Sequence, residues 1–149
     1  MTRDQNLSQW ARWASYPANI RFADVDGYGI VHHSAYFHYF EIARLAYSRD
    51  LLDLADGDVF SVKFPLLNCT AEFRKAIEFR TEPITVIVAL ECVAEAKLVF
   101  HYRLVDGKSG TLFARGSTTH VLLDENGRAM VQLPSQFLAR IEELQNVES

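Results

Sequence analysis

The sequence predicts an α+β fold in which a curved antiparallel sheet is rolled around one long central helix. Three observations lead to this prediction. One long segment without proline or glycine carries apolar side chains on nearly all sides, so as a helix it has to be enclosed. Four later segments are rich in β-branched and aromatic residues, as strands are. The connections between those segments are too short for crossover helices, which indicates antiparallel pairing.

Length and composition limit the chain to one globular unit. Its 149 residues can build one two-layer core but are too few for two ordinary domains. We expect a single domain over 1–149, with an N-terminal extension at 1–17, a core over about 18–124 and a terminal helix at 134–144. No apolar run approaches the roughly 20 residues that cross a bilayer, so we expect no membrane insertion.

Charge and cysteine content exclude several function classes. A net charge of −4 argues against a nucleic-acid partner, which requires a broad basic surface. The first 17 residues are too polar for a secretory signal, so we expect a cytoplasmic protein. Cys69 and Cys92 lie far apart without metal-ligand spacing, and we expect both to be small buried residues in a reducing compartment.

The central helix is predicted over about 34–52. Ser34 is its expected N-cap, and a short strand at 20–23 followed by a turn at 24–29 is expected to lead into it. Only one narrow stripe of this helix is polar; it consists of His38, Glu41, Arg44 and Ser48.

The predicted strands of the sheet follow the helix. They cover 64–73, 84–93, 97–105 and 111–123 and are separated by turn-forming segments. In the third of these strands Leu98 and Phe100 alternate with Val99 and His101, which indicates that one face is more buried than the other.

The segment from Phe22 to Arg44 carries an ordered motif. It reads FADVDGYGIVHHSAYFHYFEIAR, with an Asp-x-Asp pair, a Gly-x-Val step and an aromatic-rich helix that ends in Glu41-Ile42-Ala43-Arg44. This pattern resembles the hot-dog-fold thioesterases, most closely the branch of 4-hydroxybenzoyl-CoA thioesterase and the short-chain acyl-CoA thioesterases associated with the Tol–Pal system. Beyond the motif, the resemblance covers about 20–124 through element order. It departs at the turn before 84–93, where family members often have a proline, a basic residue and Gly-Asp.

The resemblance implies a reaction and two catalytic groups. The reaction is hydrolysis of an acyl-CoA or acyl carrier protein thioester without a cofactor. Such hydrolysis needs a nucleophile or general base and a donor for the oxygen that gains charge. By the resemblance, Asp26 is the nucleophile or general base and the backbone amide of His33 is the donor, while Asp24 fixes the turn. The free N–H groups at a helix N-terminus suit an oxyanion.

The expected substrate-binding residues lie on the loop, the helix start and the rim. Glycine in the loop allows close approach of a substrate to the backbone. An aromatic ring near the helix start is expected to touch the acyl chain, and basic residues are expected to reach the nucleotide end of coenzyme A. The set is Gly29, Val31, Tyr36, Arg74, Lys75 and Arg80.

Metal binding is the first alternative for this segment. Asp24, Asp26 and Gly29 occupy the first, third and sixth positions of a calcium loop, but the twelfth position is Ala35, where a bidentate Glu is required. The histidines His32, His33 and His38 have no second ligand cluster at suitable spacing. We therefore expect no metal.

Two other function classes remain open. Hydratases and dehydratases of the same fold use a histidine with an acid, and His33 with Glu41 or His32 with Asp26 could form such a pair. Glu41 could equally pair with Arg44 in a structural role. A non-catalytic acyl-thioester binder is the third possibility. The acyl group itself is not encoded in a linear motif.

An open sheet edge predicts association between copies of the chain. Exposed strand edges are normally paired, shortened or covered. The resemblance implies a homo-oligomer, a two-fold dimer or a pair of such dimers, with each active site at the junction of two subunits.

Overall fold

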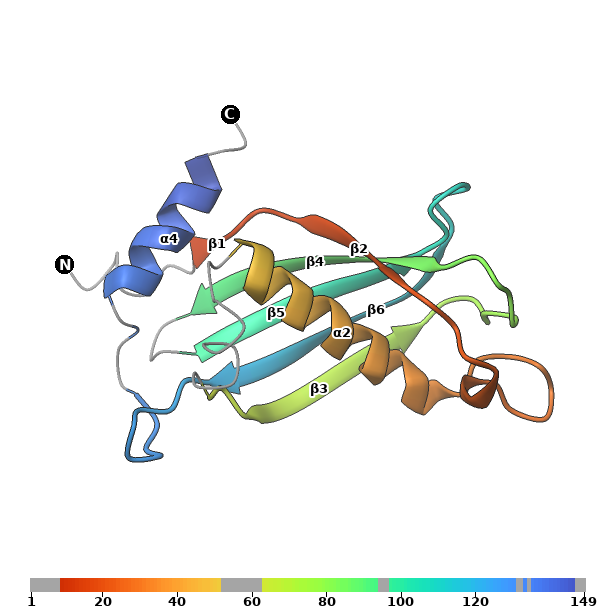
Figure 1. The fold of residues 1–149 in the computed structure, drawn as a ribbon, viewed down its shortest axis with the longest axis horizontal. Coiled ribbons are helices and arrows are strands. Elements are labelled where there is room, and N and C mark those ends of the chain that lie inside the picture. The colour runs from red at the N-terminus through yellow and green to blue at the C-terminus, as the bar shows by residue number, and fades with distance from the viewer. Residues whose placement is uncertain (1–8, 52–62, 94–96, 131–132, 134, 147–149) are drawn as a thin grey trace.

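The computed structural model describes residues 9–51, 63–93, 97–130, 133 and 135–146. In these residues six strands form one curved antiparallel sheet, and a long helix crosses one of its faces (Figure 1). The elements in chain order are β1 (Gln9–Trp10), β2 (Ala14–Ala18), the 3-10 turn η1 (Phe22–Asp24), α2 (His33–Leu51), β3 (Leu66–Phe73), β4 (Ile84–Val93), β5 (Lys97–Val105), β6 (Leu112–Val121) and α4 (Ser135–Asn146).

The strands are not arranged in sequence order. The sheet runs β1-β4-β5-β6-β3, and β2 also pairs with β4. Each neighbouring pair is antiparallel. The strand that follows α2 in the chain is therefore at one edge of the sheet, and the two N-terminal strands are at the other. The hot-dog arrangement predicted from the sequence is confirmed.

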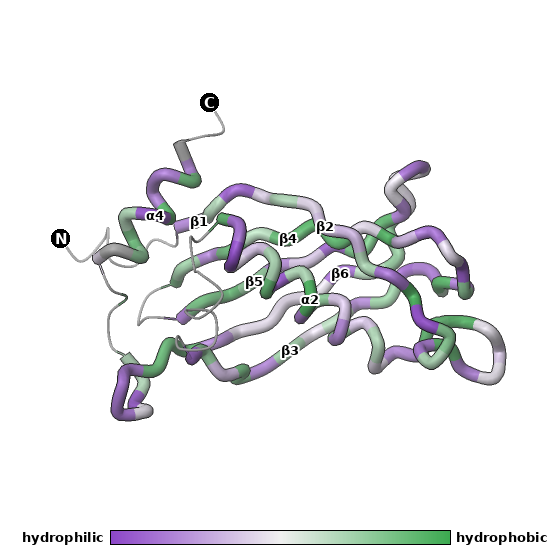
Figure 2. The backbone as a smooth tube through the Cα atoms, in the orientation of Figure 1, coloured by the Kyte–Doolittle hydropathy of each residue, from purple (hydrophilic) through white to green (hydrophobic). Residues whose placement is uncertain are grey.

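The predicted strands agree closely with the observed ones. The bounds 84–93 and 97–105 are those of β4 and β5, while β3 and β6 are two to three residues shorter than predicted. The burial alternation in β5 is also confirmed: Leu98 and Phe100 are buried, and Val99 and His101 are partly exposed. Figure 2 shows mostly hydrophobic residues along β4, whereas β5 carries both hydrophobic and hydrophilic residues.

The predicted strand at 20–23 is wrong. The Asp24 carboxylate accepts a hydrogen bond from the Arg21 amide at 3.0 Å, which closes the chain into η1. The strand lies earlier, as β2, where Pro17 is tolerated because β2 is an edge strand. The sheet thus begins inside the segment 1–17 that the sequence analysis assigns to an extension.

Helix α2 begins one residue before the predicted N-cap. His32 takes that role: its Nδ1 accepts the Ser34 amide at 3.2 Å. The predicted polar stripe is wrong at Ser48, which is fully buried, whereas Ile42 is exposed. Within one chain α2 is buried on its sheet-facing side and open on the other; the predicted end at Leu52 lies outside the described residues.

A directed chain of hydrogen bonds crosses the buried interface between α2 and the sheet. The Phe64 carbonyl can only accept, so His120 donates from Nδ1 (2.9 Å) and its Nε2 accepts the Thr118 hydroxyl (2.9 Å). Thr118 then accepts from the Tyr102 hydroxyl (2.6 Å), which accepts from Arg44 (3.2 Å). Burial, assisted by the Arg44 charge, lowers the pKa of His120 to about 4. The imidazole is therefore neutral at pH 7.

The remaining predictions concern the terminal helix and the cysteines. Helix α4 buries Ile141 and Leu144, and its predicted first residue, 134, lies outside the described residues. Cys92 is buried as predicted, but Cys69 is exposed because it lies on the edge strand β3. In the described part of the chain no helix is long and apolar enough to cross a membrane.

Candidate active site

The loop between η1 and α2 is a tight hairpin. Val25 and Val31 form an antiparallel bridge, the Asp26 amide donates to the Ile30 carbonyl at 2.9 Å, and Gly29 has a φ of 80°. That left-handed conformation favours glycine. The loop is further held by the segment after β3, since the Val31 amide donates to the Ile77 carbonyl at 2.8 Å.

The Asp26 carboxylate has one oxygen engaged and one free. Oδ1 accepts the amides of Tyr28 at 2.8 Å and Ile30 at 3.4 Å. For Oδ2, the described residues supply no hydrogen-bond partner. The turn thus fixes the carboxylate while leaving an oxygen for chemistry.

The same turn occurs a second time in the chain, around Asp124. Its Oδ1 accepts the amides of Asn126 (2.8 Å) and Arg128 (3.0 Å), Gly127 has a φ of 79°, and the bracketing residues form the same kind of bridge. Hydrogen bonding within the turn is therefore not specific to function. The difference is location, because only the turn at Asp26 leads directly into the N-terminus of a long helix.

The first turn of α2 supplies one uncommitted backbone donor. The His32 amide donates to the Asp24 carbonyl at 2.8 Å, the Ser34 amide to the His32 ring and the Ala35 amide to the His32 carbonyl at 3.0 Å. No acceptor among the described residues accounts for the His33 amide. Because a helix N-terminus is its positive end, this amide suits a developing negative charge.

Two recesses flank the start of α2. The first, of about 510 Å³, includes Asp26, His32 and Ser34 in its lining. The second, of about 260 Å³, contains most of the other predicted site residues. It is lined by Ile30, Val31, His33, Tyr36, Phe73, Arg74, Lys75 and Ala76. The structure thus places Asp26 in one recess and the predicted acyl and phosphate contacts in the next.

Arg80 is the predicted site residue that does not join this group. Its guanidinium bonds the Asp106 carboxylate at 2.9 Å and the carbonyls of Glu82 and Pro83, and it lies over the Phe113 ring. These contacts fix the turn before β4. Hydrogen bonds from the Lys108 amide and from Arg80 lower the pKa of Asp106 to about 2, so the pair is charged at neutral pH.

The helix acid Glu41 pairs with residues of its own helix and not with His33. Its carboxylate lies 3.9 Å from His38 and 3.9 Å from Arg44, on the open side of α2. The structural pairing with Arg44 is confirmed, and the pairing with His33 that a hydratase would use is not formed. The described residues contain no group of three histidine, cysteine or acidic side chains that could hold a metal ion.

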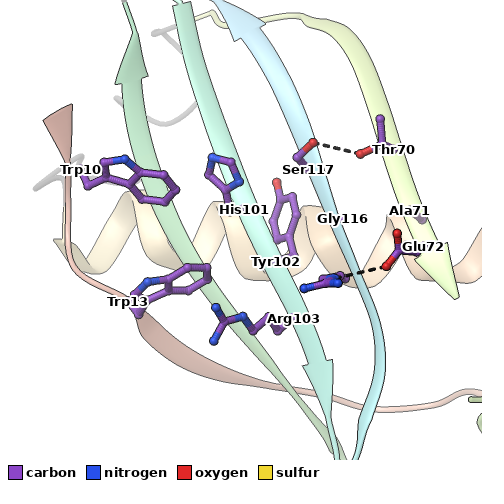
Figure 3. A pocket seen from close by; sticks show the side chains of 11 residues that line it. Trp10, Trp13, Thr70, Ala71, Glu72, His101, Tyr102, Arg103, Gly116 and Ser117 are labelled. Atoms are coloured by element: carbon purple, nitrogen blue, oxygen red, sulfur yellow. Dashed lines mark hydrogen bonds and ion pairs between the residues drawn. The ribbon is translucent and has the colours of Figure 1, made fainter. Parts of the chain in front are cut away.

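A third recess, of about 540 Å³, lies on the face of the sheet opposite α2 (Figure 3). Four of the side chains that line it form what we term the outer-face cluster: Trp10, Trp13, His101 and Arg103. Trp10 stacks on His101 at 4.5 Å between ring centroids, and Arg103 lies 4.6 Å from the centre of the Trp13 ring. These groups bind one another, and none belongs to the hairpin or the helix start.

The sequence and the fold both match known thioesterases. Residues 20–141 match the family model of the thioesterase-like superfamily. A protein of Aquifex aeolicus that carries the name esterase is 30% identical over 124 residues, which are 83% of this chain and 93% of that protein. A Bacillus subtilis protein, YneP, named as an acyl-CoA thioesterase, is 25% identical over 79% of this chain and 85% of its own length.

A solved structure with the same fold is the DHNA-CoA thioesterase from Staphylococcus aureus. Its TM-score is 0.74 at 23% identity, over 92% of this chain and 95% of that one. Together, these matches show to which class of protein the chain belongs. The chain belongs to the thioesterase-like superfamily and is a thioester hydrolase with the hot-dog fold.

The sequence analysis missed one residue beside the site. That analysis does not single out Tyr39, which is fully buried and whose hydroxyl donates to the Asp24 carboxylate at 2.8 Å. The sequence signal for such a contact is a tyrosine within a helix that has to be enclosed, because a buried tyrosine hydroxyl usually finds a hydrogen-bond partner.

Proposed function

We propose that this enzyme hydrolyses the thioester of an acyl-CoA and that the Asp26 carboxylate carries the reaction. The observation behind the proposal is that a carboxylate oxygen and a helix N-terminal amide, neither with a partner among the described residues, follow each other in the chain. These are the two groups that thioester hydrolysis requires. No cofactor takes part in the proposed reaction.

The proposed steps conserve every proton. As general base, Asp26 takes a proton from water while the water oxygen bonds to the thioester carbon. The His33 amide stabilises the resulting oxyanion. The carbon–sulfur bond then breaks, and the protonated Asp26 returns its proton to the thiolate. As nucleophile, Asp26 would instead form an anhydride with release of the thiolate. Water would then hydrolyse that anhydride to the free acid and the Asp26 carboxylate, and the proton lost from the water would pass to the thiolate.

The basic residues beside the site support coenzyme A as the carrier. Arg74 and Lys75 line the recess next to His33, and both are exposed. Arginine and lysine are the usual ligands of phosphate groups. Tyr36 and Phe73 line the same recess with an edge-to-face contact at 4.8 Å between ring centroids, which suits an acyl chain or ring.

Exposed apolar side chains support an oligomer, and we propose a homodimer through the β3 edge. Leu66, Leu67 and Phe73 on β3 are each at least half exposed. Near the hairpin, Phe22 is 79% exposed and Tyr28 is 90% exposed. Large apolar patches of this kind are usually covered by a partner. In this dimer a second subunit closes the acyl site. Leu67→Lys should therefore sediment as a monomer, and that monomer should lack thioesterase activity.

Replacement of Asp26 tests the catalytic proposal. Asp26→Asn keeps the turn and removes the base or nucleophile, so kcat should fall by about a hundredfold or more. Asp124→Asn is the matched control, because it alters the same turn away from the helix, and its kcat should match that of the wild type. Release of thiol from acetyl-, hexanoyl-, palmitoyl- and benzoyl-CoA provides the readout. Full activity in Asp26→Asn would refute the proposal, and loss of activity in EDTA would refute the metal-free reaction.

A further inference from the structure

We propose that Tyr39 is a positioning residue for this reaction and that it acts through Asp24 on the Asp26 carboxylate. The inference rests on the proposed role of Asp26. In this proposal the buried hydroxyl of Tyr39 fixes the position of the Asp26 hairpin relative to α2.

The Asp24 carboxylate is buried, and each of its two oxygens accepts two hydrogen bonds. Asp24 is 4% exposed, and its Oδ2 accepts the Tyr39 hydroxyl at 2.8 Å and the Arg21 amide at 3.0 Å. Its Oδ1 accepts Arg21 Nε at 3.1 Å and Nη2 at 2.8 Å. Burial alone would raise the pKa of Asp24, but the Arg21 and Tyr39 hydrogen bonds outweigh it and lower the pKa below its usual value. Asp24 is thus held as an anion.

These bonds connect three segments at one point. Arg21 precedes η1, Asp24 ends it, and Tyr39 lies in the second turn of α2. The Asp24 carbonyl also accepts the His32 amide at 2.8 Å, immediately before the helix. Asp24 therefore holds the helix through both its side chain and its main chain.

The connection from Asp24 to Asp26 is short and rigid. One residue, Val25, separates the two acids, and it is bridged to Val31. The main chain of Asp26 is bonded to Ile30 and Gly29. A shift of Asp24 relative to α2 will therefore move the Asp26 carboxylate relative to the helix amides, and misplacement by about 1 Å can cost as much as 100-fold in rate.

The test is the removal of one oxygen atom. Tyr39→Phe keeps the ring and its packing, and we expect kcat to fall by about 10-fold with KM changed less than about twofold. Tyr47→Phe is the matched control. Tyr47 is on the same helix, is equally buried, and donates its hydroxyl to the Arg12 carbonyl at 2.7 Å, away from the hairpin. Its kcat should remain within about twofold of the wild-type value.

A double-mutant cycle separates positioning from a general structural defect. In the Asp26→Asn background, Tyr39→Phe should leave the residual rate unchanged, because the group that it positions is absent. The substrate is the fastest acyl-CoA of the panel above. An equal loss in both backgrounds would overturn the inference, as would a normal kcat in Tyr39→Phe beside an inactive Asp26→Asn. Full activity of Asp26→Asn would instead overturn the proposed function, and this inference with it.

A second variant guards against misfolding. Arg21 is largely exposed, so Arg21→Gln removes the opposite support of Asp24 at little risk to the core. If Tyr39→Phe does not fold, Arg21→Gln should still lower kcat by about threefold in the wild-type background and not in Asp26→Asn. Identical behaviour in the two backgrounds would overturn the inference.

Discussion

Gly116 of β6 lies directly against the ring of Phe40 on α2. A Cβ atom at Gly116 would be 2.7 Å from Phe40 Cε2 and would also collide with the Thr70 carbonyl oxygen. The same Phe40 ring stacks on Tyr102 at 4.4 Å between centroids. Helix α2 can therefore pack this closely against β6 only because residue 116 has no side chain.

We expect Gly116→Ala to destabilise the fold by about 2–3 kcal/mol, since overpacking of a filled core costs this much. Part of the collision is with backbone, which cannot rotate away. Urea denaturation is the measurement. Gly27→Ala is the control: an added Cβ there meets no atom within 4 Å, and the free energy of unfolding should be almost unchanged.

Ser48→Ala should stabilise the protein by about 1 kcal/mol. The Ser48 hydroxyl is buried and has no hydrogen-bond partner in the part of the chain that the structure describes. Its desolvation is therefore uncompensated, and alanine is also the better helix former. Thr118→Val gives the contrast, because it removes a buried hydroxyl that has two partners and should destabilise. A melting temperature for Ser48→Ala below that of the wild type would contradict this prediction.

Acid should destabilise the protein through His120. The pKa of this residue is about 4 in the folded state and 6.5 ordinarily. Between these values the unfolded chain binds a proton that the folded chain does not, so the free energy of unfolding decreases as the pH falls from about 6.5 to about 4. Above pH 6.5 this residue has no effect. The full loss is on the order of 3 kcal/mol.

The measurement for His120 is urea denaturation at pH 7 and pH 4.5. His120→Gln cannot bind the proton, so its stability should change less over this interval than that of the wild type. If the wild type and His120→Gln lose the same free energy of unfolding between pH 7 and pH 4.5, the acid effect comes from other groups and the prediction is wrong.

Of the three basic residues expected to bind coenzyme A, only Arg74 and Lys75 should contribute phosphate contacts. Arg74→Ala and Lys75→Ala should each raise KM for an acyl-CoA by about 3–10-fold, as expected when a charge-assisted hydrogen bond is lost. Arg80→Ala should leave KM unchanged and lower the melting temperature, because Arg80 is bound to Asp106 and does not line the recess beside His33. An N-acetylcysteamine thioester lacks the nucleotide, so its KM should not respond to any of the three. A raised KM for acyl-CoA in Arg80→Ala would refute this division.

Local patterns predicted most of this fold, and long-range contacts explain the errors. The alternation of Leu98 and Phe100 with Val99 and His101 identified β5 because burial alternates along a strand. The edge strand β2 was missed because Pro17 resembles a strand breaker until its edge position is known. Arg80 was assigned to substrate because its partner, Asp106, is 26 residues away. The Asp26 motif was found because its parts are contiguous in sequence.

Tryptophan fluorescence of this protein reports on the outer-face cluster. The chain has two tryptophans in all, Trp10 and Trp13, with ring centroids 6.3 Å apart. One is stacked on His101 and the other lies under Arg103, and both are remote in the fold from the hairpin of Asp26. Ultraviolet emission of the native protein therefore comes from one side of the sheet. A molecule that docks on that side will alter the emission, whereas turnover at the hairpin on its own will pass without a signal.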